Sequence, residues 1–154
     1  WLGWWTMSDT QKLNDLLHLA HTRVLNAEEL ESLNALNGGL AELLGLQFTH
    51  VGPREARAKL QVRPEHHQPW GVANGGLYCS IAETVASIAS VAAAGAPAVG
   101  VNNSSDFIRS TGEGELEAVA TPVQLGSRTH LWSVEMLQGG KLIARTTLRT
   151  MILS

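Results

Sequence analysis

Glu83 is the first candidate for chemistry in this chain, because it is the only charged residue between Gln68 and Ser105. The rest of that stretch is uncharged and rich in glycine, alanine, serine and aliphatic residues. A carboxylate in such surroundings either turns toward water or is kept inside, and burial without a partner is costly or raises the pKa of the carboxyl. Environments of this kind produce catalytic bases, so Glu83 is predicted to be a catalytic carboxylate.

Other reactive side chains lack the neighbours that known types of site require. Cys79 has no evident partner base and is expected to be a small buried hydrophobe. Ser80 does not lie in a Gly-x-Ser-x-Gly turn, so the serine-hydrolase pattern is excluded. His66 and His67 are expected to be solvated loop residues, and no spacing of Cys, His and acidic residues resembles a metal site. No metal or redox cofactor is therefore expected.

The segment that carries Glu83 is predicted to be a long apolar helix, which ends near Ala94 at Gly95 and Pro97. A loop over residues 65–76, with one proline and three glycines, opens it. A helix that is apolar on nearly every side must be enclosed, and a curved sheet is the simplest enclosure. The Ala and Ser content and the charge of Glu83 disfavour a membrane span.

Strand patterns flank this helix on both sides. Residues 46–62 read as two strands, the second of which alternates apolar and charged or polar residues from Ala56 to Val62. Four further strands are predicted over residues 99–107, 115–124, 129–137 and 142–153, with glycine-containing turns between them. The order of elements predicts an α+β fold with a mainly antiparallel sheet.

The N-terminal part is predicted to be a helical extension over residues 11–44, ahead of one domain over residues 45–154. Its helices are expected to cover either a pocket or a sheet edge, and no feature of the sequence chooses between the two. Leucine spacing indicates a short first helix and a better-marked second one from Ala27 to Leu44, weakened midway by Gly38 and Gly39. Residues 1–6 are aromatic and lack a signal-peptide pattern, and Met7 resembles a natural start. Residues 1–6 are expected to be a cloning remnant or upstream residues and are excluded from the fold prediction.

Composition restricts the partners. A net charge of −3, a pI near 6.1 and scattered Lys and Arg residues argue against a nucleic-acid partner. Charged residues make up 16% of the chain, below the typical quarter, which favours a surface covered by a second subunit. Cys79 stands alone, so no intrachain disulfide can form, and a reducing cytosol is the expected compartment.

The run His-Gln-Pro-Trp-Gly-Val-Ala-Asn-Gly-Gly over residues 67–76, followed by Glu83 in an alanine-rich helix, resembles the signature of hotdog-fold acyl-CoA thioesterases. Within that superfamily it is most similar to the PaaI-like group and to 4-hydroxybenzoyl-CoA thioesterases of the Arthrobacter type. Residues 106–109 and 126–129 also resemble later motifs of the family. The resemblance implies a hotdog fold, in which a curved sheet wraps a long central helix.

The resemblance also implies roles for individual residues. Glu83 matches the family's nucleophile or general base, and Gly75 matches the backbone N–H donor that polarises the thioester carbonyl. Gln68 matches a residue that orients the thioester or water, and Ser87 lies where relatives place a Thr that assists the attacking water. Gln68 is equally consistent with hydrogen bonding within the loop, and Ser87 with bonding back to the preceding turn of the helix. Arg109, Ser127, Arg128 and Thr129, at strand ends or turns, are candidate contacts to the phosphates of coenzyme A, and each arginine is equally consistent with a solvated surface residue. Asn74 and Gly76 are further candidate contacts to substrate or coenzyme A, and Asn74 is also a residue type preferred as an N-cap. Asn74 stands where the family usually has His, which argues against the hotdog dehydratases.

Spacing along the helix adds a prediction about assembly. Gly75 and Glu83 are eight residues apart, or about 12 Å along one helix, so they cannot flank one carbonyl within one chain. The site therefore predicts a homodimer, or a dimer of dimers, with active sites shared between subunits.

The expected activity is hydrolysis of an aromatic or medium-chain acyl-CoA to free acid and coenzyme A. Trp70 and Tyr78 are candidates for lining the acyl pocket, although each is equally consistent with core packing. The alternative function is a hotdog module that binds acyl-CoA without hydrolysing it, and a hydratase is a third reading. The fold by itself does not decide among these functions.

Overall fold

The computed structural model describes residues 5–154, and in it three helices precede the sheet. They are α1 (Met7–Thr22), α2 (Ala27–Ala35) and α3 (Gly39–Leu44). The expected helix from Ala27 to Leu44 is thus two helices, and the prediction of one was wrong. Gly39 takes a left-handed backbone (φ +57°), and its neighbour Gly38 is extended, so the chain turns here instead of continuing the helix.

Residues 5 and 6 belong to the folded part of the chain, although they were excluded from the predicted fold. The Thr6 side chain caps α1 by accepting from the Asp9 N–H, and the Asp9 carboxylate accepts from the Thr6 N–H in return. The Trp5 indole donates to the Leu36 carbonyl at 2.9 Å and so links the start of α1 to the end of α2. Residues 1–4 lie outside the described part of the chain.

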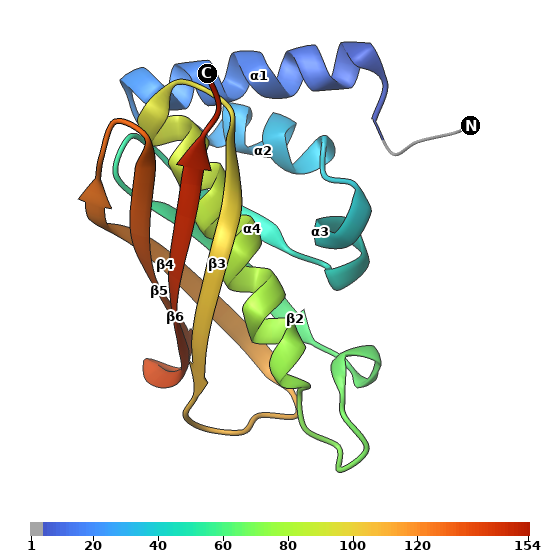
Figure 1. Ribbon diagram of the computed structural model, residues 1–154. Coiled ribbons are helices and arrows are strands. Elements are labelled where there is room, and N and C mark those ends of the chain that lie inside the picture. Colours follow the sequence, from blue (N-terminus) through green and yellow to red (C-terminus); the bar gives the residue numbers. More distant parts are fainter. Residues whose placement is uncertain (1–4) are drawn as a thin grey trace.

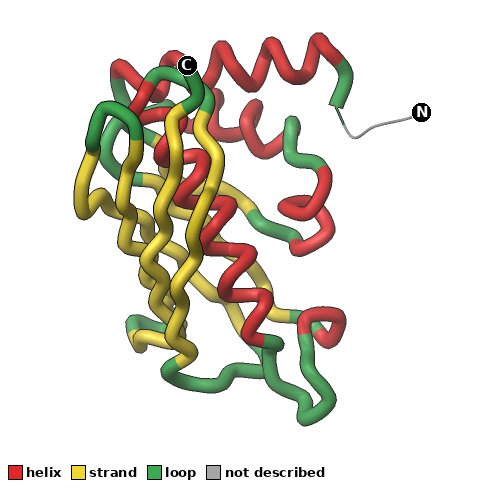
Figure 2. The backbone as a smooth tube through the Cα atoms, viewed as in Figure 1, coloured by secondary structure: helices red, strands yellow, loops and turns green. Residues whose placement is uncertain are grey.

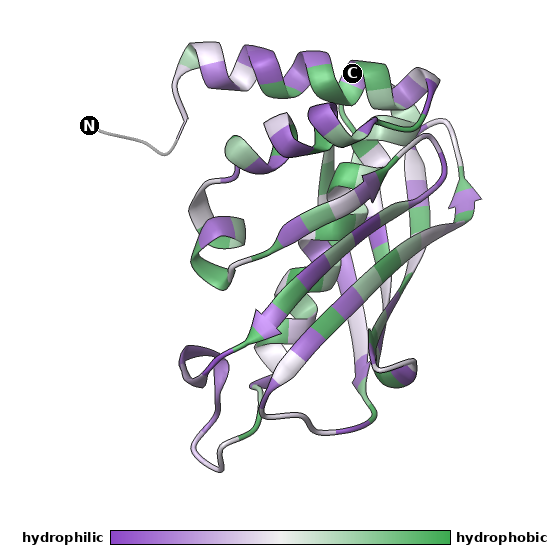
Figure 3. Cartoon of the chain, turned by 180° about the vertical axis from the view of Figure 1, so that it is seen from behind, coloured by the Kyte–Doolittle hydropathy of each residue, from purple (hydrophilic) through white to green (hydrophobic). Residues whose placement is uncertain are grey.

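Six strands form one antiparallel sheet in the order β1-β2-β4-β5-β6-β3. The strands are β1 (Gln47–Val51), β2 (Ala56–Val62), β3 (Ala98–Phe107), β4 (Gly114–Leu125), β5 (Thr129–Gln138) and β6 (Lys141–Ile152). Strand β2 alternates buried and exposed residues along its whole length, as its sequence predicts, and similar alternation of hydropathy is visible along neighbouring strands (Figure 3). The predicted α+β architecture and its strands are confirmed, with boundaries shifted by at most one residue.

Helix α4 (Gly75–Ala94) is the central helix, and the curved sheet wraps around it (Figures 1 and 2). Its buried face consists of small and branched residues such as Ile81, Val85 and Ala89, which pack against β3, β4, β5 and β6. By length and composition it is the one helix in residues 5–154 that could cross a membrane, but half of its apolar window is buried inside the fold. Helix α4 is therefore the core helix, and the cytosolic location stays a prediction.

Strand β3 is the free edge of the sheet, and nearly all of its residues are exposed. It follows α4 directly and pairs on its other side with β6 from Ala98 to Phe107. The opposite edge strand, β1, is shorter and contacts α2. A long edge with unpaired backbone groups and one charged residue, Asp106, is a ready template for pairing with another strand.

A buried polar cluster joins the core helix to the sheet. The Ser90 hydroxyl lies 2.8 Å from Nδ1 of His130 and 2.6 Å from the Thr150 hydroxyl, and all three side chains are buried. Burial lowers the pKa of His130, and burial followed by the nearby Arg63 charge lowers the pKa of His66. Both histidines therefore favour the neutral form in the folded state. The prediction that His66 is a solvated loop residue was wrong, because the side chain is buried.

Acidification from pH 7.5 to 5.5 is expected to destabilise the fold. The unfolded chain binds protons at these histidines below about pH 6.5, whereas in the folded chain their pKa values are lower and they stay neutral. The free energy of unfolding therefore falls as the pH falls toward the folded pKa values. The contribution is at most about 1.4 kcal/mol per pH unit for each histidine. Urea midpoints at fixed protein concentration measure this slope. His130→Gln should show a shallower slope than the wild type, and equal slopes would contradict the assignment to His130.

Candidate active site

Glu83 lies in the middle of α4, on an exposed face next to the edge strand β3. Its carboxylate is exposed in the single chain, so of the two arrangements considered from sequence the structure has the one that turns outward. No ion pair to Glu83 forms within residues 5–154, which argues against a structural salt bridge. One turn further along, the Ser87 hydroxyl donates to Glu83 Oε1 at 3.2 Å. The structure thus brings together these two predicted site residues.

Gly100 of β3 makes room for the Glu83 carboxylate. A Cβ atom added at Gly100 would lie 2.9 Å from Glu83 Oε1 and 3.4 Å from its Cγ. Glycine in a strand often marks such a close approach, and here a carboxylate from the neighbouring helix occupies the space. Sequence reasoning missed Gly100, although an isolated glycine in the predicted strand was a usable signal.

Gly100→Val is expected to lower kcat for thioester substrates by about 10-fold or more, because it displaces the Glu83 carboxylate by about an ångström from its position next to Ser87. The valine suits an edge strand, so secondary structure measured by circular dichroism should stay unchanged. Val101→Ala is the matched control in the same strand. An unchanged kcat in Gly100→Val would show that the position of Glu83 is not constrained by β3.

An apolar cavity of about 280 Å³ opens beside Glu83, between α4 and the N-terminal helices. Its walls come from α1, α2, α3, β1 and α4, and they include Trp5 before α1. The lining residues are Trp5, Leu13, Leu33, Leu36, Asn37, Gly38, Leu40, Ala41, Phe48, Glu83, Thr84, Ser87 and Ile88. Neither Trp70 nor Tyr78 belongs to this wall. Trp70 is 82% exposed in the loop, and Tyr78 is buried 5.7 Å from the Phe107 ring.

The start of α4 presents a free backbone donor. Asn74 is the N-cap, as its residue type predicts, and its side-chain oxygen accepts from the Gly76 N–H at 2.8 Å. This bond uses the Gly76 donor and leaves the Gly75 N–H without an acceptor within the described residues. An unpaired N–H at the positive end of a twenty-residue helix favours a negatively charged oxygen.

The loop before α4 is braced by hydrogen bonds on both sides. His67 Nε2 lies 2.6 Å from the Gly112 carbonyl, and the Ala73 N–H donates to the Thr111 carbonyl at 2.8 Å. Within the loop, Gln68 Oε1 accepts from the Trp70 N–H at 2.8 Å. Gln68 therefore has the loop-stabilising contact considered from sequence, while its amide nitrogen remains available for a site role.

Phe107 at the end of β3 lies directly over Gly75. A Cβ atom at Gly75 would lie 2.2 Å from the Phe107 ring, so glycine is required for this contact. Gly75 and Phe107 border a cavity of about 200 Å³ that Arg109 also lines. Sequence reasoning selected Gly75 and Arg109 but missed Phe107, because only the crossing of β3 over the start of α4 brings its ring to this place.

The candidate coenzyme A contacts fall into separate regions of one chain. Arg109 follows β3, where its N–H donates to the Ile143 carbonyl at 3.0 Å. Ser127 and Arg128 lie in the turn between β4 and β5, and Thr129 begins β5. In this turn the Arg128 carbonyl accepts from the Ile152 N–H. Ile143 and Ile152 lie near opposite ends of β6, which places the two arginines roughly 30 Å apart at the strand rise. One subunit therefore does not bring them together.

Gly75 and Glu83 also border different cavities, although both belong to the uninterrupted helix α4. The shared site was predicted because Gly75 and Glu83 are too far apart along one helix to act on the same carbonyl, and this separation is present in the structure. Within one chain, the structure assembles a carboxylate with Ser87 at one place and a free N–H with Arg109 at another.

Comparisons with known proteins agree with this architecture. The family model described as Thioesterase superfamily matches residues 71–144, a span that includes Gly75 and Glu83 but not Gln68. Rv1847 of Mycobacterium tuberculosis is 43% identical over 112 residues, which cover 69% of this chain and 80% of that protein. Its solved structure has a TM-score of 0.73 over 74% of this chain and 95% of that one, at 42% identity.

Two further relatives carry names that state a thioester substrate or a pathway. The 1,4-dihydroxy-2-naphthoyl-CoA hydrolase of Escherichia coli is 32% identical over 128 residues, which cover 80% of this chain and 94% of that enzyme. A mutant of the phenylacetic acid degradation protein PaaI from Thermus thermophilus has a solved structure that is 35% identical with a TM-score of 0.70, over 73% of this chain and 97% of that one. With this sequence identity over most of the relatives' length and the observed helix-in-sheet architecture, the chain belongs to the thioesterase superfamily, as a PaaI-like member with the hotdog fold.

Proposed function

We propose that this protein hydrolyses an aromatic or medium-chain acyl-CoA to the free acid and coenzyme A, with Glu83 as the catalytic carboxylate. The observation that carries the proposal is the position of Glu83, which is hydrogen-bonded to Ser87 and borders an apolar cavity. The carboxylate is accessible, lacks a cationic partner within residues 5–154 and lies next to space for an acyl group.

Two forms of attack are compatible with this arrangement. As a general base, Glu83 removes a proton from water while the water oxygen bonds to the thioester carbon; as a nucleophile, its carboxylate oxygen bonds to that carbon and water later hydrolyses the anhydride. In both cases the carbonyl oxygen becomes an oxyanion, the carbon–sulfur bond breaks and coenzyme A leaves as the thiol after protonation. The Gly75 N–H supplies the oxyanion donor, and Ser87 and the Gln68 amide orient the reacting groups. These steps use the chain's own residues and no metal or redox cofactor.

A homodimer paired along β3 would complete the site. Two subunits related by a two-fold axis pair their edge strands antiparallel, so the Phe107 end of one β3 meets the Gly100 end of the other. Gly75 lies under Phe107, and Glu83 lies beside Gly100. Such pairing therefore brings the Gly75 N–H of one subunit toward the Glu83 carboxylate of the other, and two identical sites result.

The same pairing accounts for the scattered coenzyme A candidates. Arg109 lies beyond the Phe107 end of β3, and Arg128 lies near the Ala98 end, because it contacts Ile152, the partner of Ala98. In an antiparallel pair, Arg109 of one subunit and Arg128 of the other come to the same end of the joined sheet. Ser127, Thr129, Asn74 and Gly76 are proposed to contribute polar contacts to coenzyme A there.

Release of free thiol from a panel of aromatic and aliphatic acyl-CoAs, with wild type and Glu83→Gln side by side, tests the proposed function. Hydrolysis by the wild type that is lost in the variant supports a thioesterase that uses Glu83. Saturable binding of acyl-CoA with no thiol release by either protein would instead establish the non-catalytic binding module.

A further inference from the structure

We propose that the N-terminal helices α1–α3, together with Trp5, form the wall of the acyl pocket opposite α4 and set the length of the acyl group. The pocket is the cavity beside Glu83, and its occupant is an apolar acyl group of medium length. This inference rests on the proposed thioesterase function, since it assigns the acyl part of the same site.

The cavity is positioned for the acyl part of a thioester at Glu83. Glu83 and Ser87 lie on its α4 wall, so a carbonyl carbon held at the carboxylate has the cavity directly behind it. The remaining walls come from helices that precede the sheet, with Leu13 from α1, Leu33 from α2 and Ala41 from α3. An acyl chain entering from Glu83 therefore meets residues of the N-terminal extension.

The polar groups of the wall are already used by the protein. The Thr84 hydroxyl donates to the Ser80 carbonyl at 2.8 Å, and the Asn37 amide donates to the Leu46 carbonyl at 2.8 Å. Among the lining residues within 5–154, Glu83 is the only charged one. A buried polar substituent on the substrate would find few partners and would be costly to desolvate, so the wall selects an apolar group.

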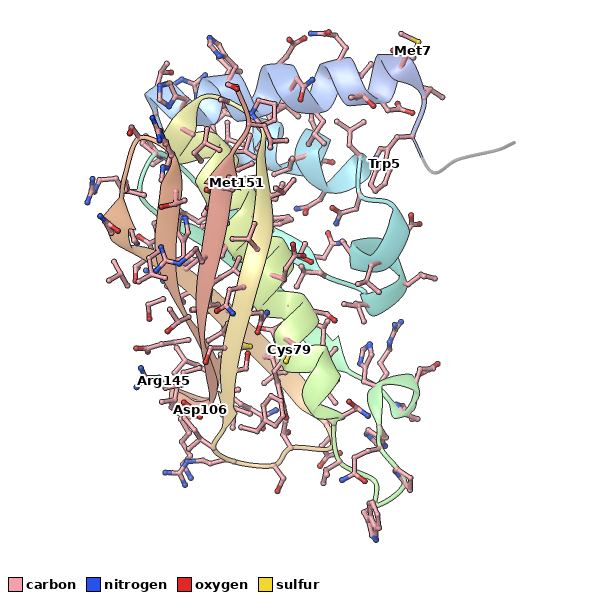
Figure 4. The ribbon with its side chains drawn as sticks, viewed as in Figure 1. Trp5, Met7, Cys79, Asp106, Arg145 and Met151 are labelled. Atoms are coloured by element: carbon pink, nitrogen blue, oxygen red, sulfur yellow. The ribbon has the colours of Figure 1, made fainter. Side chains whose placement is uncertain are left out.

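Trp5 forms the part of the wall next to the turn between α2 and α3. Its indole N–H donates a hydrogen bond to the Leu36 carbonyl. Two carbons of its ring lie 3.1 and 3.5 Å from the position that a Cβ of Gly39 would take. The ring thus packs on the turn between α2 and α3, and Figure 4 shows Trp5 below the start of α1, on the side of α2 and α3. Because the ring is held at both ends, it is a fixed wall at the rim, and 46% of Trp5 remains exposed.

The cavity volume sets the size of the occupant. At about 30 Å³ for each water-sized group, a cavity of 280 Å³ holds roughly nine non-hydrogen atoms. A chain of about eight to ten carbons fills this space, whereas a short chain leaves much of the apolar wall in contact with water. Each methylene that enters is expected to raise kcat/KM about fourfold until the pocket is full.

Two substitutions that change the pocket in opposite directions test the proposal. The measurement is kcat/KM for thiol release from straight-chain acyl-CoAs of four to sixteen carbons. Ala41→Phe fills the pocket from α3, and we expect it to lower kcat/KM for decanoyl-CoA by at least about tenfold while leaving butyryl-CoA within about threefold of wild type. Trp5→Ala removes the outer wall and should move the optimum to longer chains.

Leu43→Ala is the matched control, because Leu43 lies on the same short helix, is 63% exposed and does not line the cavity. It should leave the chain-length profile unchanged. Profiles of Ala41→Phe and Trp5→Ala that coincide with wild type would overturn the proposal, provided that circular dichroism shows both variants folded. If Ala41→Phe fails to fold, Trp5→Ala alone tests the proposal. An unchanged optimal chain length in Trp5→Ala would show that Trp5 does not limit the pocket.

Binding of non-hydrolysable S-alkyl-CoA thioethers, measured by calorimetry on the same proteins, separates the two proposals. A chain-length preference in binding that the variants shift, without hydrolysis of any acyl-CoA by wild type, would retain the pocket and reject the thioesterase. Hydrolysis that depends on Glu83 but has no length preference altered by the variants would retain the thioesterase and reject the pocket.

Discussion

Replacement of Glu83 by glutamine is expected to lower kcat by about 10²- to 10⁴-fold, the range associated with loss of a positioned general base. Glutamine keeps the shape of the side chain and can still accept from Ser87, so the change removes basicity with little effect on packing. Because Glu83 is exposed in the single chain and the substitution removes no buried contact, the variant is expected to fold as the wild type does. Single-turnover thiol release at saturating acyl-CoA measures the loss.

Two further variants serve as comparisons for Glu83→Gln. Ser87→Ala removes the hydroxyl that donates to the Glu83 carboxylate and should cost less than Glu83→Gln, because the base itself remains. Leu43→Ala, on an exposed face of α3, should leave kcat unchanged. Activity of Glu83→Gln within a factor of about two of the wild type would reject Glu83 as the catalytic carboxylate.

Mixing two inactive variants is expected to restore activity if the site is shared between subunits. One variant is Glu83→Gln. The other is the double variant Gly75→Pro, Phe107→Ala. Proline lacks the N–H that donates to the oxyanion, and it suits the first position of a helix. Phe107→Ala makes room for the proline ring, because the Phe107 ring otherwise occupies that space. Loss of one oxyanion donor is expected to lower kcat about 10²- to 10³-fold, and Phe107→Ala alone is the control.

The fraction of activity that returns in the mixture shows whether Gly75 and Glu83 of one site come from different subunits. In a heterodimer of the two variants, one site combines both defects and the other combines Gly75 of one subunit with Glu83 of the other, both intact. After unfolding and refolding together at equal amounts, about half of the dimers are mixed and one site in each works, so about a quarter of the wild-type activity should return. If Gly75 and Glu83 act within one chain, the mixture stays inactive, which would refute the shared site.

Local chemistry in the sequence was sufficient to predict the elements around the site. The period of two in β2, the apolar run of α4 and the glycines that end or turn them each predict one structure, and the structure has it. The N-cap role of Asn74 likewise follows from residue type alone. The break between α2 and α3 was underestimated, because the leucine pattern continues across Gly38 and Gly39 while the backbone turns there.

Contacts between distant segments could not be read from the chain. Gly100 lies against Glu83, and Phe107 lies over Gly75, because β3 leaves the end of α4 and returns along it. The N-terminal extension was expected to cover either a pocket or a sheet edge, and its leucines gave no means to choose. The structure places them, with Trp5, around the cavity beside Glu83.

The sequence by itself determined the family and the isolated carboxylate. An uncharged glycine-rich loop followed by one Glu in an apolar helix is a local pattern, so it can be recognised from the sequence alone. It also determined that Gly75 and Glu83 are too far apart on one helix to act on one carbonyl, since helical rise is fixed. Only the tertiary structure decided which surfaces meet: that Glu83 lies beside the edge strand β3, and that α1–α3 surround the cavity at Glu83. Such contacts depend on side-chain packing between segments far apart in sequence, and no local periodicity encodes them.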